Sequence, residues 1–196
     1  SSDDRVVDAA FRQAGITRVH DVTTLSQYMK ALRLPRLRDK RLAIISRSGG
    51  HAIVAADACE TVGFELAEFP ESFIQEIEKH FRASVIKLTN PLDLGDLFDL
   101  DVYYRIVEET LAQDNVDGVV FLHTSLTATE NDPTRDLVKR LETLSRKADK
   151  PVAVYVSANL SEIAELYRVS LSSLRQANNL RGDRIMVGQV LKIPTI

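Results

Sequence analysis

The sequence predicts an α/β protein with a mostly parallel sheet that carries helices on both faces. Short apolar runs of strand length alternate with amphipathic stretches of helical length over residues 41–156. The loops between them are short, which favours right-handed crossovers between parallel strands. Residues 42–45 are apolar at every position and rich in isoleucine, as in a strand covered on both faces.

The first forty residues predict two helices separated by a short strand. Residues 2–4 can cap a helix that Gly15 ends, and residues 16–20 have the pattern of a strand. Asp21 opens a second helix that ends before Pro35. A basic connector then leads to the main series of strands.

The main series alternates regularly. We expect strands at residues 41–46, 64–69, 85–88, 116–122 and 152–156. We expect helices at residues 52–62, 70–80, 101–111 and 131–147, with Asp101 as the cap of the third, and a stiff polar turn at residues 89–96.

Composition narrows the classes of function. The 25 basic and 28 acidic residues give a net charge of −3, which argues against nonspecific nucleic-acid or anionic-membrane binding. No apolar run approaches the ~20 residues of a membrane span, and the start lacks the form of a signal peptide. The single cysteine, Cys59, can form no internal disulfide and implies no metal site. We therefore expect a cytoplasmic protein.

A glycine turn between the strand at 41–46 and the next helix is the first candidate site. The start of a helix leaves backbone N–H groups unpaired and carries the positive end of the helix dipole, so it attracts anions. Glycine lets a ligand approach the backbone closely. The predicted phosphate-binding residues are Ser46, Arg47, Ser48, Gly49, Gly50 and His51. A tight turn without a ligand is the alternative, since the turn is neither a Walker loop nor a GxGxxG motif.

Two further loops fall at the same edge of the predicted sheet. Ligands of open parallel sheets bind at the carboxyl ends of the strands. The polar residues there are Asn90, Asp93, His123, Thr124 and Ser125. His51 and His123 are conceivable nucleophiles, but a helix start and a strand end explain them without chemistry, and no catalytic residue is assigned.

The pattern changes after residue 156. Residues 160–167 and 171–177 predict two short helices, and residues 187–194 end in a strand. A unit of about forty residues buries little surface alone, so it needs a further strand or the larger body. We predict two domains, 1–156 and 157–196.

Residues 3–156 resemble the segment of ADP-forming acyl-CoA synthetases, the succinyl-CoA synthetase superfamily, that follows the phosphohistidine motif. The matching stretches are 8–16, 44–60 with its Ser-Gly-Gly turn, Asn-Pro-Leu-Asp-Leu at 90–94, and Lys-Pro-Val-Ala-Val at 150–154. They lie in family order over about four-fifths of the chain. The resemblance implies a flavodoxin-like CoA-ligase domain whose glycine turn helps to cradle the phosphate carried on a mobile histidine.

The same resemblance implies cofactors and partners. CoA, ATP or ADP, and phosphate would be the ligands of the intact enzyme, with none bound covalently. The phosphohistidine loop and the ATP-grasp domain do not occur in this sequence, so we expect partners that supply them and no turnover by this chain alone.

Residues 160–194 resemble a LysM module, a βααβ unit that binds N-acetylglucosamine polymers such as peptidoglycan or chitin. The match includes Leu-Ser-Glu-Ile-Ala-Glu-Leu-Tyr at 160–167 and Val-Gly-Gln at 187–189. The resemblance implies glycan contacts at Leu160, Asn178, Leu180 and Ile185. Residues 157–159 replace the family's Gly-Asp-Thr. We also infer that the strand at 152–156 serves both domains by pairing with residues 190–193, which would cover the sheet edge.

Three functions therefore remain open from the sequence. The chain is a partial acyl-CoA synthetase domain, a glycan-binding module on an α/β scaffold, or an acyl-CoA-sensing regulatory domain. The presence of a ligase-like segment and a LysM-like segment in one chain is also consistent with a recombined protein. The acyl group and the oligomeric state have no signature in the sequence.

Overall fold

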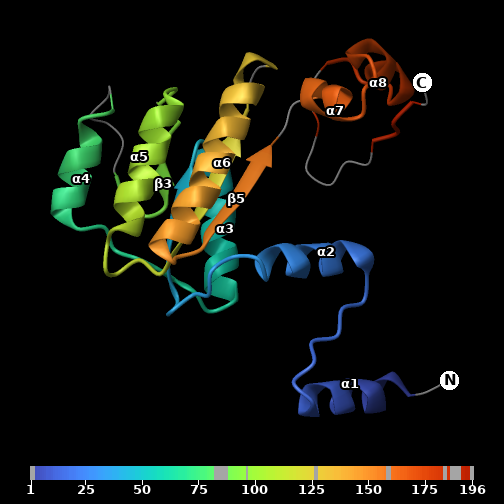
Figure 1. The fold of residues 1–196 in the computed structure, drawn as a ribbon, viewed down its shortest axis with the longest axis horizontal. Coiled ribbons are helices and arrows are strands. Elements are labelled where there is room, and N and C mark those ends of the chain that lie inside the picture. Colours follow the sequence, from blue (N-terminus) through green and yellow to red (C-terminus); the bar gives the residue numbers. More distant parts are fainter. Residues whose placement is uncertain are drawn as a thin grey trace. The chain divides into compact units, whose positions relative to one another are not determined.

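A computed structural model gives the fold shown in Figure 1. It describes residues 3–81, 88–95, 97–125, 128–157, 160–182, 185 and 191–194. The chain forms two compact units, Ser1–Leu34 and Pro35–Ile196. This division does not coincide with the domain boundary after residue 156 that the sequence predicts, and that boundary stays a prediction.

The first unit contains two capped helices. In α1 (Asp4–Gln13) the cap Asp3 accepts a hydrogen bond from the Arg5 amide, and in α2 (Val22–Ala31) the cap Asp21 accepts one from the Thr24 amide at 2.8 Å. Gly15 takes the left-handed conformation just after α1, at φ 69°.

The strand predicted at residues 16–20 is wrong. That segment is not in a strand and has no neighbouring strand in the described part of its unit, so its backbone forms no ladder there. Arg18 instead holds the segment to α1 through ion pairs with Asp4 and Asp8.

The second unit is organised around a parallel sheet. The strands are β1 (Arg41–Ser46), β2 (Glu65–Leu66), β3 (Leu92–Asp93), β4 (Gly118–Thr124) and β5 (Val152–Ser157). Their order is β2-β1-β4-β5, with β3 also paired to β1, and every pairing is parallel. The predicted doubly wound, mostly parallel architecture is confirmed.

Among the described residues, the helices that flank this sheet are α3 (Gly49–Thr61), α4 (Glu71–Glu78), α5 (Leu100–Leu111) and α6 (Asn131–Ala148), the last preceded by a 3₁₀ turn at Ala128–Glu130. α3 begins three residues earlier than predicted, at the first glycine. The cap of α5 is Asp99, not Asp101, which lies in the first turn.

Two strands also differ from the prediction. β2 has only two residues, and β3 lies where a polar turn is predicted. Most of the strand predicted at 85–88 falls outside the described residues, and Leu88 itself is not in a strand.

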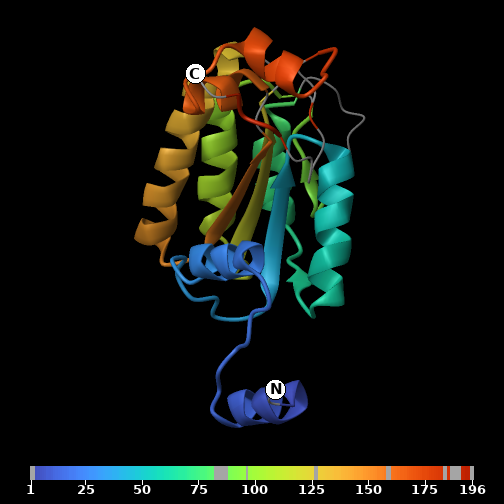
Figure 2. The ribbon, with the colours of Figure 1, turned by 90° about the vertical axis from the view of Figure 1, so that its right-hand side faces the viewer.

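The helices divide unequally between the two faces of the sheet, as Figure 2 shows. On one face, Ala43, Ile45 and Phe121 bury apolar side chains under α4, α5 and α6. On the other, Leu42, Ile44 and Leu122 pack against Cys59 and the small residues of α3. The alternation along β1 therefore serves both cores, as expected for a buried parallel strand.

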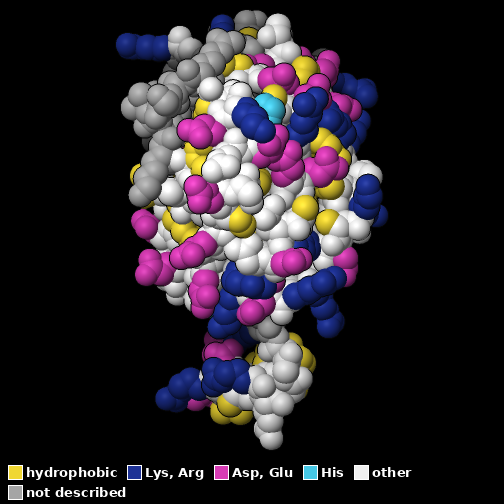
Figure 3. All heavy atoms as spheres, turned by 90° about the vertical axis from the view of Figure 1, so that its left-hand side faces the viewer, with side chains coloured by type: hydrophobic (Ala, Val, Ile, Leu, Met, Phe, Trp, Pro, Cys, Tyr) yellow, Lys and Arg dark blue, Asp and Glu magenta, His cyan; other side chains and the backbone are white. Residues whose placement is uncertain are grey.

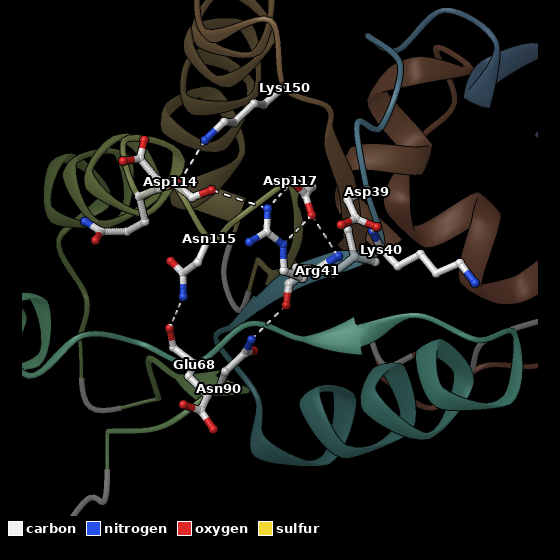
Figure 4. Close-up of polar contacts among 11 residues, drawn as sticks. Asp39, Lys40, Arg41, Glu68, Asn90, Asp114, Asn115, Asp117 and Lys150 are labelled. Carbon is white, nitrogen blue, oxygen red and sulfur yellow. Dashed lines mark hydrogen bonds and ion pairs between the residues drawn. The ribbon is translucent and has the colours of Figure 1, made fainter.

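A polar network closes the amino end of the sheet (Figure 4). Arg41 Nε and Nη2 each donate to the Asp117 carboxylate at 2.9 Å, and the Arg41 amide donates to it as well. This guanidinium holds the pKa of Asp117 below its usual range. The Lys150 ammonium donates to the carbonyls of Leu111 and Gln113, where it caps the end of α5.

The C-terminal part contains α7 (Leu160–Leu166) and α8 (Leu171–Ala177) with a small core of its own. Leu191 and Ile193 pack onto this core, and the Asn178 side chain bonds both backbone groups of Lys192. Residues 191–193 are not in a strand, and β5 pairs with β4 alone in the described part of the sheet. The prediction that residues 190–193 pair with β5 is therefore wrong for residues 191–193, because this segment is bound to the end of α8. Residue 190 lies outside the described residues.

Acidic and basic side chains are interspersed over the face of the molecule drawn in Figure 3. Among the described residues, no helix is both long and apolar enough to cross a membrane.

Candidate functional site

The junction of β1 and α3 forms the predicted glycine turn. Ser46 is fully buried, and its hydroxyl donates to the Ser48 carbonyl at 2.8 Å and accepts from the Ser48 amide at 3.1 Å. Ser48 is the cap of α3 but its side chain makes no capping bond. Within the described structure the amides of Gly49, Gly50 and His51 have no hydrogen-bond acceptor. The start of α3 therefore presents unpaired donors.

Asp93 lies directly beside this helix start. Its Oδ1 accepts a hydrogen bond from the Gly95 amide at 2.9 Å. Its Oδ2 lies 2.6 Å from the position that a Cβ on Gly49 would take, and Oδ1 lies 3.1 Å from that position on Gly95. A side chain at Gly49 would therefore displace the Asp93 carboxylate, and one at Gly95 would press against it.

Arg47 points into the protein. Its guanidinium is buried, donates to the Thr124 carbonyl at 2.9 Å, and forms an ion pair with Glu130 at 2.8 Å. The exposed ring of Phe98 covers it, with 5.6 Å between Cζ and the ring centroid. Because its charge is matched by Glu130, Arg47 orders the loops around the helix start and is not a free phosphate ligand.

His51 occupies the first turn of α3. Its ring lies edge-on to Tyr155 of β5, with 6.1 Å between centroids. Nδ1 is buried and has no partner in the described part of the chain.

The Asn90 side chain is engaged entirely with backbone groups. Oδ1 accepts from the Ile44 amide at 2.9 Å, while Nδ2 donates to the carbonyls of Leu42 and Ala67 at 2.8 and 2.9 Å. It bridges β1 and the segment after β2, so its role in this structure is to hold the sheet together.

Of the three residues predicted at the end of β4, Thr124 contacts the glycine turn, because its carbonyl accepts from Arg47, while His123 and Ser125 bond to residues of α6. His123 is fully buried among Tyr103 and Phe121, and its Nε2 lies 3.1 Å from the Thr134 hydroxyl. Burial, reinforced by the charge of Arg47, lowers the pKa of His123 to about 4. The neutral ring belongs to the core. Ser125 is also buried and donates to the Asn131 side chain, while Thr124 lies half-buried at the strand end.

Two of the four residues predicted to contact glycan are engaged within the protein itself. Leu160 is fully buried, and Asn178 makes its three bonds to the backbone of Leu174 and Lys192. Leu180 and Ile185 are half-buried around the same small core.

Sequence reasoning missed Glu130 and Phe98. Both contact Arg47, and no local spacing links residues 47, 98 and 130 in the sequence. Asp93 was expected at this edge, but its contact with Gly49 was not.

Comparison with known proteins identifies relatives of this chain. The alpha subunit of acetate–CoA ligase (ADP-forming) II from Pyrococcus furiosus is 25% identical over 169 residues, which are 82% of this chain and 36% of the relative. Acetate–CoA ligase (ADP-forming) I from Archaeoglobus fulgidus is 36% identical over 118 residues, or 59% of this chain and 17% of the relative. The chain is a relative of the ADP-forming acyl-CoA synthetases.

Solved structures related to these synthetases have the same fold. The dinucleotide-forming acetyl-coenzyme A synthetase 1 of Ca. Korarchaeum cryptofilum, in complex with phosphate and ADP, superimposes with a TM-score of 0.68 at 24% identity, over 92% of this chain and 37% of that one. Its apo form gives the same TM-score at 25% identity, over 91% and 38%.

This relative of the synthetases spans only part of their length, between 17 and 36% of the curated proteins above. Residues 159–194 match the model of the LysM domain family. The chain thus joins a CoA-ligase-like α/β unit to a LysM-like segment, as its sequence indicates.

Proposed function

We propose that this chain is the CoA-ligase part of an ADP-forming acyl-CoA synthetase, in which the start of α3 receives a phosphoryl group carried on a histidine of another domain. The observation that carries the proposal is the set of unpaired amides at Gly49, Gly50 and His51. The relatedness to acetate–CoA ligases (ADP-forming) supports the reaction class. CoA, ADP or ATP, and phosphate would be its ligands.

The weak binding of an anion at a helix start explains why the phosphoryl group would be delivered while attached to another domain. A helix start stabilises an anion by about 0.3–1 kcal/mol, and by up to ~2 kcal/mol when partly buried. On that scale alone free phosphate would bind more weakly than about 10 mM. A tethered group reaches an effective concentration of about millimolar or higher, so delivery on a loop raises the occupancy of a site that binds the free group weakly.

Catalysis would need the partner domains. Among the candidates at this edge, Arg47, Asn90 and His123 are engaged in internal contacts. We therefore expect the chain alone to bind and orient, with nucleotide chemistry supplied by an ATP-grasp domain and the phosphohistidine by a third element.

Reconstitution tests this proposal. The phosphohistidine-bearing and ATP-grasp domains of a relative are mixed with this chain, and ATP formation from acyl-CoA, ADP and phosphate is measured. We expect ATP only when all parts are present, and a loss of at least about tenfold for Gly50→Leu, which adds bulk beside the free amides. A Cβ on Gly50 meets only Ser48 Oγ, at 3.9 Å, so the variant should fold.

The matched control is Gly182→Leu, at a glycine whose Cβ position has no neighbour within 4 Å. Equal activity of Gly50→Leu and Gly182→Leu, or no ATP from the complete mixture, would count against the proposal.

Glycan binding is the second candidate, favoured by the LysM match at residues 159–194. The burial of Leu160 and the internal bonds of Asn178 weaken it. Retention on insoluble peptidoglycan or chitin above that of a chain shortened at residue 157 would support it, and equal retention would exclude it.

A further inference from the structure

The C-terminal part, made of α7, α8 and residues 191–194, lies at the same edge of the sheet as the glycine turn. α7 begins at Leu160, shortly after β5 ends at Ser157, and the Ser157 carbonyl accepts a hydrogen bond from the Ser125 amide at 3.2 Å. α6 also begins at this edge, because it follows the end of β4. In Figures 1 and 2 the strands point toward the C-terminal part. It therefore stands beyond the carboxyl ends of the strands.

This part of the chain has a hydrophobic core of its own. The described residues of that core all lie between Leu160 and Ile193. The described cores on the two faces of the sheet are built from residues 42–154. Because the cores share no described residue, the C-terminal part can shift relative to the sheet without opening any of them.

Arg135 of α6 joins the C-terminal part to the sheet domain. Its Nε lies 3.3 Å from a carboxylate oxygen of Glu162, and its Nη2 donates to Glu165 at 3.3 Å, both in α7. Its Nη1 donates to Asp132 within α6. All of these side chains are partly exposed, and such an ion pair changes an equilibrium by only about 1.5- to 5-fold. The contact of Arg135 with α7 is therefore a weak latch.

A partner domain over the glycine turn needs the space beside the C-terminal part. β4 separates β5 from β1, and neighbouring strands lie about 4.8 Å apart, so the ends of β1 and β5 are about 10 Å apart. The His51 ring at the start of α3 is edge-on to Tyr155 near the end of β5. A domain of about 100 residues has a radius of gyration of about 13 Å. Such a domain, centred on the glycine turn, would meet the C-terminal part.

We propose that the C-terminal part is an autoinhibitory lid. Held by Arg135, it obstructs the approach of the phosphoryl-carrying domain to the glycine turn, and loss of the Arg135 contacts with α7 opens the way. This inference rests on the proposed function and adds its regulation. Arg135 acts through α7 and is a positioning residue. The LysM-like segment thereby has a role within the chain that requires no glycan.

A purely structural role for Arg135 makes a different prediction. Its loss would then change the free energy of unfolding without easing the approach of a partner domain. Charge reversal separates the two roles. In Arg135→Glu the new carboxylate repels Glu162 and Glu165. Adding Glu162→Lys and Glu165→Lys restores both pairs with the charges exchanged.

The test measures ATP formation in the reconstituted mixture as the concentration of the phosphohistidine-bearing domain is varied. Arg135→Glu should lower the concentration that gives the half-maximal rate by about two- to fivefold, because the lid no longer competes with the partner. The triple variant should return it to the wild-type value. The matched control is Arg146→Glu, the same charge change in α6 at an arginine that pairs with Glu142 of the same helix. It should behave like the wild type.

Nitrogen-15 relaxation of the full chain alone tests the latch directly. The amides of α7 and α8 should tumble with those of the sheet in the wild type and faster than them in Arg135→Glu; the same tumbling in both proteins overturns the lid. An unchanged or higher half-maximal concentration in Arg135→Glu, or a triple variant that does not return to the wild-type value, also overturns the lid and leaves the proposed function standing if the wild type forms ATP. No ATP from any variant overturns both.

Discussion

At the scale of single residues, Asn90 replaces a missing piece of strand. β2 pairs with the start of β1 and β3 with its end, and no described residue forms a strand along the middle of that edge. The Asn90 carboxamide bonds there to the Ile44 amide and the Leu42 carbonyl, and so completes the ladder. A residue that the sequence suggests for ligand binding satisfies buried backbone groups instead.

Replacing Asn90 should therefore be costly. Asn90→Ala leaves a buried N–H and two carbonyls without this partner, which predicts a loss of about 2–4 kcal/mol in the free energy of unfolding. Urea denaturation measures it. Asn115→Ala is the control, since Asn115 is half-buried and in the described structure its side chain bonds only the Glu68 carbonyl; this change should cost less than about 1 kcal/mol. Equal losses in the two variants would contradict this account of Asn90.

His123 makes stability depend on pH. Its pKa is about 4 in the folded protein against 6.5 when unfolded, so the unfolded chain binds the extra proton first. The contribution is complete above pH 6.5 and is lost as pH falls toward 4, by about 3 kcal/mol in total. His123→Gln, which can still bond Thr134, should flatten that part of the stability profile. The control is His20→Gln, at an exposed histidine, which should leave that part of the profile unchanged. If the dependence of stability on pH persists in His123→Gln, other groups cause it.

At the scale of elements, the start of α3 depends on two adjacent glycines for different reasons. A Cβ on Gly49 would lie 2.6 Å from Asp93 Oδ2, whereas one on Gly50 meets only Ser48 Oγ at 3.9 Å. The first glycine makes room for a carboxylate, and the second leaves the helix surface open.

Alanine substitutions at Gly49 and Gly50 should therefore affect the stability of the protein differently. Gly49→Ala overpacks the contact with Asp93 and should destabilise by about 1–3 kcal/mol. Gly50→Ala should be neutral or stabilise by up to about 1 kcal/mol, because alanine favours the helix. Thermal unfolding compares the two. In an Asp93→Ala background the cost of Gly49→Ala should shrink; an unchanged cost would show that Asp93 is not the obstacle.

The elements that sequence predicts well are those with strong local signals. The capped helices α1 and α2 and the apolar strands β1, β4 and β5 all appear close to their expected bounds. The strand at 16–20 fails because strand pairing depends on a distant partner. β3 and the Asp93 contact were not predictable for the same reason, since both require β1 and residues 92–95 to meet in space.

At the scale of the whole molecule, the fold brings the β1–α3 turn and the β3 loop to one edge of the sheet. The sequence predicts this edge because parallel strands end on the same side. It does not predict which polar residues there remain free. Arg47 is matched by Glu130, 83 positions away in the chain, and only the folded structure reveals that pairing.

The central claim is that the amides at the start of α3 receive a phosphoryl group. The most direct measurement adds a peptide with a hydrolysis-stable phosphohistidine analogue to the ¹⁵N-labelled chain and follows its amide resonances. The claim predicts that Gly49, Gly50 and His51 shift, and that the unphosphorylated peptide leaves them unchanged. Shifts confined to other parts of the chain, with these three amides unaffected, would contradict it.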